Sequence, residues 1–348
     1  MSDTIIIVGA GQAGGWAAAT LRKEGYAGRV VLIGDEPHVP YERPPLSKAV
    51  LKGEAEPQHT HLMPADKFAE LDLDFRSEVR VTAIDRAARE VELADGERIG
   101  YDKLILAMGG GARTLPVPGG DLPGVLTLRT LADAAQLKER LNDGARIVVV
   151  GGGWIGLEVA ATARQAGADV TVVEAMDRLC QRSVPVVISD YLRRLHEGHG
   201  VDVRLGSGVQ RIESASNGSD GNTTSGDASQ GLRVELTDGT WLEADTVVAG
   251  IGLVPHLELA EAAGLELDGG IVVGPDTRTS DPDIFAAGDV AVAHNPWVGG
   301  RIRLESWQNA QDQGIAAAKA ALGQDVTHEP LPWFWSDQYE VNLQLYGL

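Results

Sequence analysis

The chain has 348 residues, a hydrophobic fraction of 43%, a formal net charge of −20 and a single cysteine, Cys180. This length allows two or three domains with a large core. The negative charge would repel phosphates, which disfavours a general affinity for nucleic acid. One cysteine excludes an intrachain disulfide, a redox-active cysteine pair and a four-thiolate iron–sulfur cluster.

The N-terminal residues carry the pattern of a dinucleotide-binding βαβ unit. An apolar run precedes Gly9, Gly11 and Gly14, a helical segment of small residues follows, and a second apolar run leads to Asp35. The glycines would let the backbone approach a pyrophosphate at the N-terminus of the helix. Asp35 is expected to end the second strand and to bind a ribose hydroxyl, with Glu36 as the neighbouring alternative.

A proline-rich segment follows at residues 37–53. Four prolines in nine positions stiffen it and are expected to exclude helix until after Pro45. Ser47 is then a candidate N-cap for a short helix, which would deliver Lys48 from a rigid turn. From spacing alone, Lys48 is more simply interpreted as a surface lysine.

Short strands are predicted over residues 71–106, with a hairpin turn at Asp95-Gly96. They end in an apolar strand over Leu104–Met108, which a glycine turn follows. Residues 116–124 have the composition of a crossing between domains, and a helix is predicted over Leu131–Leu141.

The pattern of the first unit then recurs 142 positions later, from Gly9 to Gly151. An apolar strand precedes Gly151, Gly153 and Gly156, and a second apolar run ends at Glu174. Because each copy has a strand before its glycines and a helix after them, two ligand-free turns are a poor explanation. The sequence predicts two dinucleotide sites.

After Glu174 a helix is predicted over Pro185–Leu195. Residues 213–231 are rich in Ser, Gly, Asn, Asp and Thr, and we interpret them as a mobile loop at a hairpin tip. The strands flanking this loop are predicted over Val209–Ile212 and Leu232–Leu236.

A buried strand over Thr246–Ala249 leads into a second glycine turn. In Asp283–Val290 an apolar strand ends in Ala-Gly-Asp, which places Asp289 at the carboxyl end of a sheet, where α/β proteins bind ligands. Residues 305–322 are predicted to form a helix with a small-residue face, and the segment from Pro330 is aromatic and rich in strands.

Six motifs together carry a resemblance to one family. They are the paired glycine loops, Tyr41–Lys48 (YERPPLSK), Gly153–Glu158 (GWIGLE), Phe285–Asp289 (FAAGD), Glu305–Ala310 (ESWQNA) and Pro332–Asp337 (PWFWSD). From residue 4 to its last residue the chain resembles the FAD-dependent ferredoxin reductases of bacterial oxygenase systems, with apoptosis-inducing factor as a more distant relative.

The resemblance implies an α/β fold with two Rossmann-like dinucleotide-binding domains of the glutathione-reductase type. The expected divisions are residues 1–112 for the first part of the FAD domain, 113–245 for the NADH domain, 246–324 for the second part of the FAD domain and 325–348 for the start of a C-terminal domain. Because family members usually continue beyond Leu348, that last domain is expected to be truncated.

The resemblance also implies which residues contact the cofactors. For FAD they are Gly9, Gly11, Gly14, Asp35, Glu36, Arg43, Lys48, Ala107, Gly109, Arg129, Asp289, Glu305, Ser306 and Trp307. For NADH they are Gly151, Gly153, Trp154, Ile155, Gly156, Glu158, Glu174, Arg182, Gly250 and Gly252. Met108 departs from the family, whose members usually have Thr there.

Lys48 and Glu158 are implied to meet near flavin N5 as the catalytic pair. A lysine charge there would favour hydride transfer, and Glu158 would neutralise it, because either charge buried alone is costly. A helix N-terminus near Trp307 would stabilise negative charge on the reduced flavin. Glu174 predicts a preference for NADH over NADPH, which Arg178 and Arg182 could soften.

The implied electron acceptor is a [2Fe–2S] ferredoxin that feeds a terminal oxygenase, most simply an aromatic-ring-hydroxylating dioxygenase. Such ferredoxins are usually acidic, so docking would need a local basic patch, for which Arg301, Arg303 and Trp335 are candidates. A cytochrome P450 system, an NADH oxidase or quinone-type reductase, and a redox-sensing protein resembling apoptosis-inducing factor stay open as alternatives. A self-contained disulfide reductase is excluded by the single cysteine.

No run of about 18 apolar residues could span a membrane, so no membrane partner is expected. The N-terminus enters an apolar run directly, without the basic region and small-residue cleavage site of a secretion signal. The sequence therefore predicts a cytoplasmic protein. No metal site is expected, and Cys180 is interpreted as a small packed residue.

Overall fold

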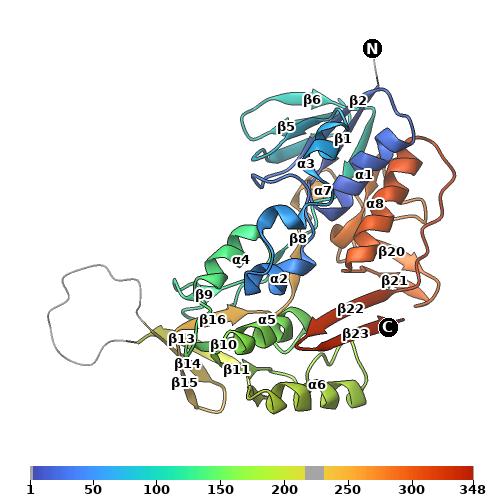
Figure 1. The fold of residues 1–348 in the computed structure, drawn as a ribbon. Coiled ribbons are helices and arrows are strands. Elements are labelled where there is room, and N and C mark those ends of the chain that lie inside the picture. The colour runs from blue at the N-terminus through green and yellow to red at the C-terminus, as the bar shows by residue number, and fades with distance from the viewer. Residues whose placement is uncertain (1–2, 216–230, 348) are drawn as a thin grey trace, which may run out of the picture.

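The computed structural model describes residues 3–215 and 231–347, and it contains two α/β units that lie one above the other in Figure 1. The first unit is built on a parallel sheet in the order β19-β7-β1-β2-β3. Its strands are β1 (Thr4–Val8), β2 (Arg29–Ile33), β3 (Asp74–Arg76), β7 (Lys103–Leu106) and β19 (Ile284–Ala286).

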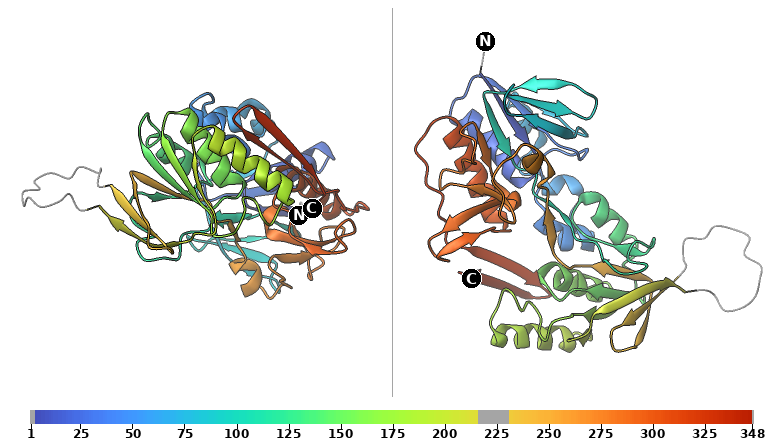
Figure 2. Two further views of the ribbon diagram at one scale, coloured as in Figure 1. Left: turned by 90° about the horizontal axis from the view of Figure 1, so that it is seen from below. Right: turned by 180° about the vertical axis from the view of Figure 1, so that it is seen from behind.

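Helices α1 (Gln12–Lys23) and α8 (Trp307–Ala321) lie side by side against this sheet (Figures 1 and 2). Their close approach explains the small-residue face of α8, because a Cβ on Gly314 would lie 2.3 Å from the Ala13 carbonyl oxygen. The other face of the sheet is covered by a three-stranded meander, β4 (Val81–Asp85), β5 (Glu90–Leu93) and β6 (Arg98–Gly100), and by α7 (Glu258–Ala262). The β5–β6 turn contains Asp95-Gly96, as predicted.

The second unit repeats this plan with a parallel sheet in the order β12-β11-β10-β16-β9. Helices α5 (Trp154–Gln165) and α6 (Val186–Gly198) contribute to its core. Its strands are β9 (Val125–Leu126), β10 (Arg146–Val150), β11 (Asp169–Val173), β12 (Asp202–Arg204) and β16 (Thr246–Ala249), and its meander is β13 (Val209–Ser214), β14 (Leu232–Leu236) and β15 (Trp241–Ala244). The two-domain α/β prediction is confirmed.

The predicted hairpin β13–β14 is present, since Ser214 pairs with Leu232 in antiparallel register. Most of the predicted loop at its tip, residues 216–230, lies outside the described residues.

The chain crosses between the two units on a pair of short antiparallel strands, β8 (Gly110–Ala112) and β17 (Leu253–Pro255). The expected boundary at residue 246 is wrong in this respect, because β16 pairs with β10 and so belongs to the second sheet. A buried apolar strand does not reveal from its sequence which of two similar sheets it joins. We therefore place the return to the first unit after β16.

The proline-rich segment forms a 3-10 helix, η1 (Pro44–Ser47), followed by α2 (Ala49–Lys52). Helical structure thus begins at Pro44, earlier than predicted, because proline is tolerated in the first turn. The N-cap of α2 is Lys48, so Ser47 does not cap it. Both helices pack on α4 (Leu131–Lys138) of the second unit through Leu46, Val50 and Leu131.

The C-terminal segment is a hairpin, β22 (Trp333–Gln338) and β23 (Val341–Tyr346), which lies between β20–β21 and α6 (Figures 1 and 2). Phe334 meets Trp154 of α5 at a ring-centroid distance of 5.1 Å. The remaining elements are η2 (Pro57–Thr60), α3 (Ala65–Ala69), β18 (Ile271–Val273), η3 (Gly288–Val290), β20 (Ala291–Asn295) and β21 (Gly300–Ile302). Within residues 3–215 and 231–347, no helix has the length and apolar character needed to cross a membrane.

Candidate active site

The first and third glycines of each turn are required by the backbone itself. Gly9 and Gly151 both have a φ of +107°, and a Cβ on them would lie 2.2 Å from the Ala107 oxygen and 2.5 Å from the Gly250 oxygen, respectively. Ala107 follows β7 and Gly250 follows β16, so each turn is pressed against the end of the neighbouring strand.

The third glycines, Gly14 and Gly156, lie on the helix that follows each turn. A Cβ there would approach the carbonyl oxygen of the first glycine to 1.8 Å and 2.1 Å. Contacts this short leave no room for any side chain, so each helix can pack on its strand only through glycine.

The middle glycines have different surroundings. A Cβ on Gly11 would meet nothing within 4 Å, and one on Gly153 would meet only the Gly250 oxygen at 4.0 Å. Gly11 is the N-cap of α1 and Gly153 that of α5, and neither helix has a side-chain cap. No side chain caps the first-turn amides of either helix, and the space beside Gly11 and Gly153 is open, which fits the pyrophosphate of a dinucleotide.

The two units differ at the end of the second strand. By register, Val8 pairs with Ile33 and Val150 with Val173, so the residue equivalent to Glu174 is Gly34. A side chain at Gly34 is excluded, because its Cβ would lie 2.5 Å from the Ala10 Cβ.

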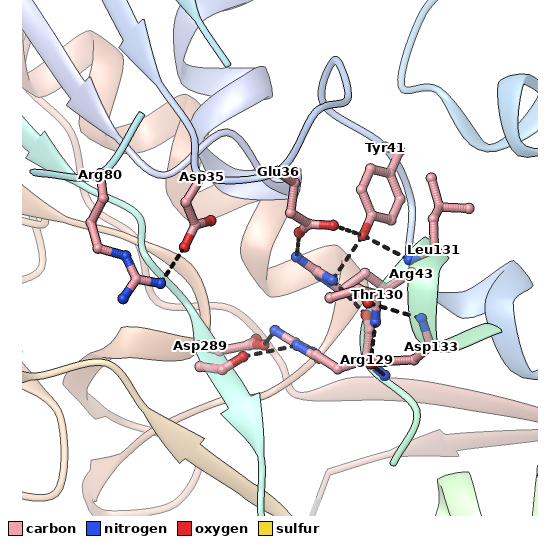
Figure 3. A network of polar contacts seen from close by, with 11 residues as sticks. Asp35, Glu36, Tyr41, Arg43, Arg80, Arg129, Thr130, Leu131, Asp133 and Asp289 are labelled. Atoms are coloured by element: carbon pink, nitrogen blue, oxygen red, sulfur yellow. Dashed lines mark hydrogen bonds and ion pairs between the residues drawn. The ribbon is translucent and has the colours of Figure 1, made fainter. Parts of the chain in front are cut away.

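Asp35 therefore lies two residues beyond β2, and the prediction that it ends that strand is wrong. Its side chain is 57% exposed and pairs with Arg80 at 3.0 Å (Figure 3). Glu36 is more enclosed, and its carboxylate accepts hydrogen bonds from the Tyr41 hydroxyl at 2.6 Å and the Arg43 guanidinium at 2.8 Å.

In the second unit, the Glu174 carboxylate accepts hydrogen bonds from the backbone amides of Gly152 at 2.7 Å and Met176 at 2.8 Å. These bonds hold it beside the glycine turn. Arg178 is occupied elsewhere, since its guanidinium donates to the Val184 carbonyl and the Ser189 hydroxyl. Arg182 is exposed.

A network of arginines and carboxylates joins four of the residues predicted for FAD (Figure 3). Arg43 donates to Glu36 at 2.8 Å and to the Arg129 carbonyl at 2.5 Å. Arg129 in turn donates to the Asp289 carboxylate at 2.9 Å and to the Gly110 carbonyl at 3.0 Å. Through Gly110 and Asp289 the network joins the crossing strand β8 to η3. Burial raises the pKa of Tyr41, which keeps its hydroxyl protonated as a donor to Glu36.

The predicted catalytic pair meets directly. The Lys48 ammonium lies 2.6 Å from Oε2 of Glu158, and their side chains are only 17% and 2% exposed. Lys48 also donates to the Pro44 carbonyl at 3.2 Å. A carboxylate this deeply buried needs such a partner.

Two serines complete this site, and neither was among the residues predicted to contact a cofactor. The Ser47 hydroxyl donates to Oε2 of Glu158 at 2.5 Å, and the Ser336 hydroxyl donates to Oε1 at 2.7 Å. Ser336 is 178 residues away in the sequence. Its presence in the PWFWSD motif is the one signal that could have drawn attention to it.

Helix α8 begins at Trp307, with Ser306 as its N-cap accepting from the Asn309 amide at 3.3 Å. The Trp307 ring meets that of Trp335 edge to face at 5.7 Å. Glu305, next to the cap, pairs with Arg303 at 2.6 Å, and burial raises the pKa of its carboxyl.

The arginines of the predicted docking patch carry no excess positive charge, because each is paired with a carboxylate. Arg301 pairs with Glu266 at 3.1 Å and Asp268 at 3.5 Å, while Arg303 pairs with Glu305. The two arginines are thus neutralised by three carboxylates. Trp335 stacks on Trp333 at a centroid distance of 5.2 Å, and its role in docking stays a prediction.

The remaining predicted residues lie at the crossings and in the first turn of α5. Gly109 and Gly252 both adopt a positive φ at the start of the crossings. Trp154 packs on the C-terminal hairpin, whereas Ile155 is exposed in the first turn of α5.

Cys180 is buried, as expected of a packed residue, and burial raises the pKa of its thiol to about 12. The described part of the chain holds no group of three or more His, Cys, Asp or Glu residues arranged for a metal ion.

Comparison with known proteins agrees with this architecture. The family model for pyridine nucleotide-disulphide oxidoreductases matches residues 3–314. Rhodocoxin reductase of Rhodococcus erythropolis is 46% identical over 345 residues, which cover 99% of this chain and 78% of that protein. The ferredoxin–NAD(+) reductase component of the anthranilate 1,2-dioxygenase system of Burkholderia cepacia is 43% identical, covering 100% of this chain and 82% of that protein.

Among solved structures, the covalent putidaredoxin reductase–putidaredoxin complex matches with a TM-score of 0.92 and 41% identity over 99% of this chain and 81% of that chain. The ferredoxin reductase for the CYP199A2 system from Rhodopseudomonas palustris matches with a TM-score of 0.91 and 41% identity, covering 99% and 82%. The chain therefore belongs to the pyridine nucleotide-disulphide oxidoreductase family, in the group of the FAD-dependent ferredoxin reductases.

Proposed function

We propose that this protein is an NADH-dependent ferredoxin reductase that uses FAD. Each turnover would convert NADH and two oxidised [2Fe–2S] ferredoxins into NAD⁺, two reduced ferredoxins and one proton. The observation that carries this proposal is the Lys48–Glu158 pair, because it joins the FAD-type unit to the NADH-type unit at 2.6 Å with both charges largely shielded from water.

The first glycine turn would hold the FAD pyrophosphate at the open N-terminus of α1, and Asp289 would contact the ribityl chain. Bound FAD supplies the chemistry that this chain lacks, namely acceptance of a hydride and release of single electrons. The Arg43–Glu36 and Arg129–Asp289 contacts keep these polar side chains in place around it. We propose that residues 1–112 and the segment from the return crossing to residue 324 form this domain.

The second glycine turn would hold the NADH pyrophosphate, and the Glu174 carboxylate would accept hydrogen bonds from the adenosine ribose. Both of its oxygens already receive backbone amide bonds, so it is oriented before the cofactor arrives. A 2′-phosphate would be repelled there, and Arg178 is not free to compensate because it binds the Val184 carbonyl and Ser189.

Lys48 would place its positive charge near flavin N5, and Glu158 would balance that charge and bind the nicotinamide amide. The role of the pair is electrostatic: it favours hydride arrival at the flavin, in a site from which water is largely excluded. The N-terminus of α8 at Trp307, capped by Ser306, would be the second positive feature of the same site.

The ferredoxin would dock over Trp335 and feed an aromatic-ring-hydroxylating dioxygenase in the cytoplasm. A relative from a dioxygenase system at 43% identity supports this choice. A cytochrome P450 system is the second candidate, supported by the similarity to the ferredoxin reductase for the CYP199A2 system.

The test is NADH-dependent reduction of cytochrome c by the FAD-loaded protein, with and without a [2Fe–2S] ferredoxin of each type. We expect reduction to require ferredoxin and to be slower with NADPH than with NADH at equal concentration. Rapid oxygen consumption without ferredoxin would favour an oxidase instead. Slow flavin reduction with a lasting charge-transfer band would favour a redox sensor.

A further inference from the structure

A chain of buried polar side chains leads from Glu158 through the C-terminal hairpin to α6. Its members are Ser336, Gln338 and His196, whose relative exposures are 0%, 1% and 0%. The distances are 2.7 Å from the Ser336 hydroxyl to Glu158, 3.0 Å from the Gln338 amide nitrogen to Ser336, and 2.8 Å from the His196 Nε2 to the Gln338 oxygen.

The direction of every hydrogen bond in this chain is fixed by its first member. A carboxylate only accepts, so the Ser336 proton points to Glu158 and the serine oxygen accepts from the Gln338 amide. The Gln338 oxygen then faces His196, which must carry its hydrogen on Nε2. Burial lowers the pKa of His196, which is consistent with a neutral ring in this position.

Two segments that are far apart in the sequence therefore converge on one carboxylate of α5. Ser47 and Lys48 reach Oε2 from η1 of the first unit, whereas Ser336 reaches Oε1 from β22 of the hairpin. One turn further along α5, Thr162 donates to the Ser47 carbonyl at 2.8 Å and ties η1 to the same helix. Removing Ser336 would leave one oxygen of a buried carboxylate without its donor.

We propose that Ser336 is a positioning residue for Glu158, and that Gln338 and His196 hold Ser336 in its donating orientation. The C-terminal hairpin then helps to position Glu158 in the hydride-transfer site. Serine and glutamine are costly in a buried position unless every partner is in place, so a chain that is fully paired specifies one geometry. This inference rests on the proposed function, in which the Lys48–Glu158 pair lies beside the flavin.

The first experiment compares Ser336→Ala with Ser336→Thr, which keeps the hydroxyl, in the FAD-loaded protein. Losing a hydrogen bond to a charged group should slow flavin reduction at saturating NADH by about 10- to 100-fold. The unbalanced charge on Glu158 should also lower the flavin midpoint potential, by about 30 mV for each tenfold change in the two-electron equilibrium. Ser336→Thr should restore both.

The second experiment tests the chain itself with Gln338→Met, which keeps the shape and removes both hydrogen bonds. In the described structure Gln338 reaches Glu158 only through Ser336, so Ser336→Ala/Gln338→Met should behave like Ser336→Ala alone. If the two substitutions slow flavin reduction by the product of their separate effects, Gln338 does not act through Ser336 and the proposal is wrong. This comparison also holds if the threonine variant does not fold.

Asn342→Ala is the matched control, because Asn342 is exposed on the same hairpin and bonds Asp337 at 2.5 Å. It should leave the rate and the potential at their wild-type values. A wild-type rate and potential in Ser336→Ala would overturn the proposal. The potential is measured by chemical reduction without NADH, so failure of NADH to reduce the wild-type flavin would count against the proposed function alone.

Discussion

Gly153 and Gly156 are three residues apart in one turn, yet a side chain at each would meet opposite surroundings. A Cβ on Gly153 would project into open space, whereas one on Gly156 would lie 2.1 Å from the Gly151 oxygen. The sequence motif treats these glycines alike. The structure separates the glycine that leaves room for a ligand from the one that lets the helix pack.

We therefore expect Gly153→Ala to fold normally but to bind NADH at least about tenfold more weakly, or ~1.4 kcal/mol, because its methyl group occupies the pyrophosphate space. Gly153 has a φ of −84°, which alanine adopts without strain. Melting temperature, FAD content and the apparent KM for NADH are the measurements. Gly156→Ala should instead lower stability by about 1–3 kcal/mol through overpacking. Equal melting temperatures for the two variants would contradict this assignment.

In the first unit, the position at the end of the second strand could not be identified from the sequence pattern. The motif places an acid near the end of the second strand, and Asp35 satisfies that spacing. The register shows that Gly34 occupies the equivalent position, because Ala10 leaves no room for a side chain there. A shift of one residue cannot be read from a pattern whose loop lengths vary.

At the scale of elements, the packing of the C-terminal hairpin on α6 depends on a neutral side chain at His196. His196 is fully buried, accepts a contact from the Tyr339 hydroxyl at 3.3 Å and faces Gln338 on its other side. Burial lowers its pKa from the usual 6.5, and this effect outweighs the Gln338 hydrogen bond, which raises the pKa. Protonating this ring would place an unpaired positive charge inside the buried interface, which is energetically costly.

The sign of the resulting pH dependence follows from proton uptake. Below about pH 6.5 the unfolded chain protonates this histidine and the folded chain does not, so stability falls as pH falls, by up to about 1.4 kcal/mol per pH unit for one proton. We expect the melting temperature to drop less between pH 7.5 and 5.5 in His196→Gln than in the wild type (roughly the window of histidine titration). His294→Gln, at an exposed position on β20, should keep the wild-type drop. Parallel curves for all three proteins would refute the role of His196.

Some secondary-structure elements could be located from local sequence patterns alone. The predicted bounds of β14 and β16 agree with the structure, because each is a short run of strand-forming residues bounded by turn residues. The 3-10 helix at Pro44 was missed, because proline ends a helix but can also begin one.

For the whole molecule, charge decides how a partner approaches. The net charge is −20, and the arginines predicted to attract a ferredoxin are already paired with Glu266, Asp268 and Glu305. Long-range forces therefore oppose the approach of an acidic ferredoxin, and we propose that binding depends on short-range contacts instead.

We expect kcat/KM for an acidic ferredoxin to rise as ionic strength increases from about 0.02 to 0.2 M, since salt screens repulsion beyond a Debye length of roughly 10 Å. The rate at saturating ferredoxin should stay constant, which serves as the internal control. A steep fall with salt would show instead that a basic surface guides docking.

The sequence by itself determined the two dinucleotide units, their glycine turns and the family, because each βαβ unit is local in the chain and its turn chemistry is written in consecutive residues. Only the tertiary structure decided what surrounds the reacting site. Arg129 reaches Asp289 across 160 residues, and Ser336 reaches Glu158 across 178. Such contacts depend on how two units and a hairpin pack together, and no residue pattern records the distance between segments so far apart.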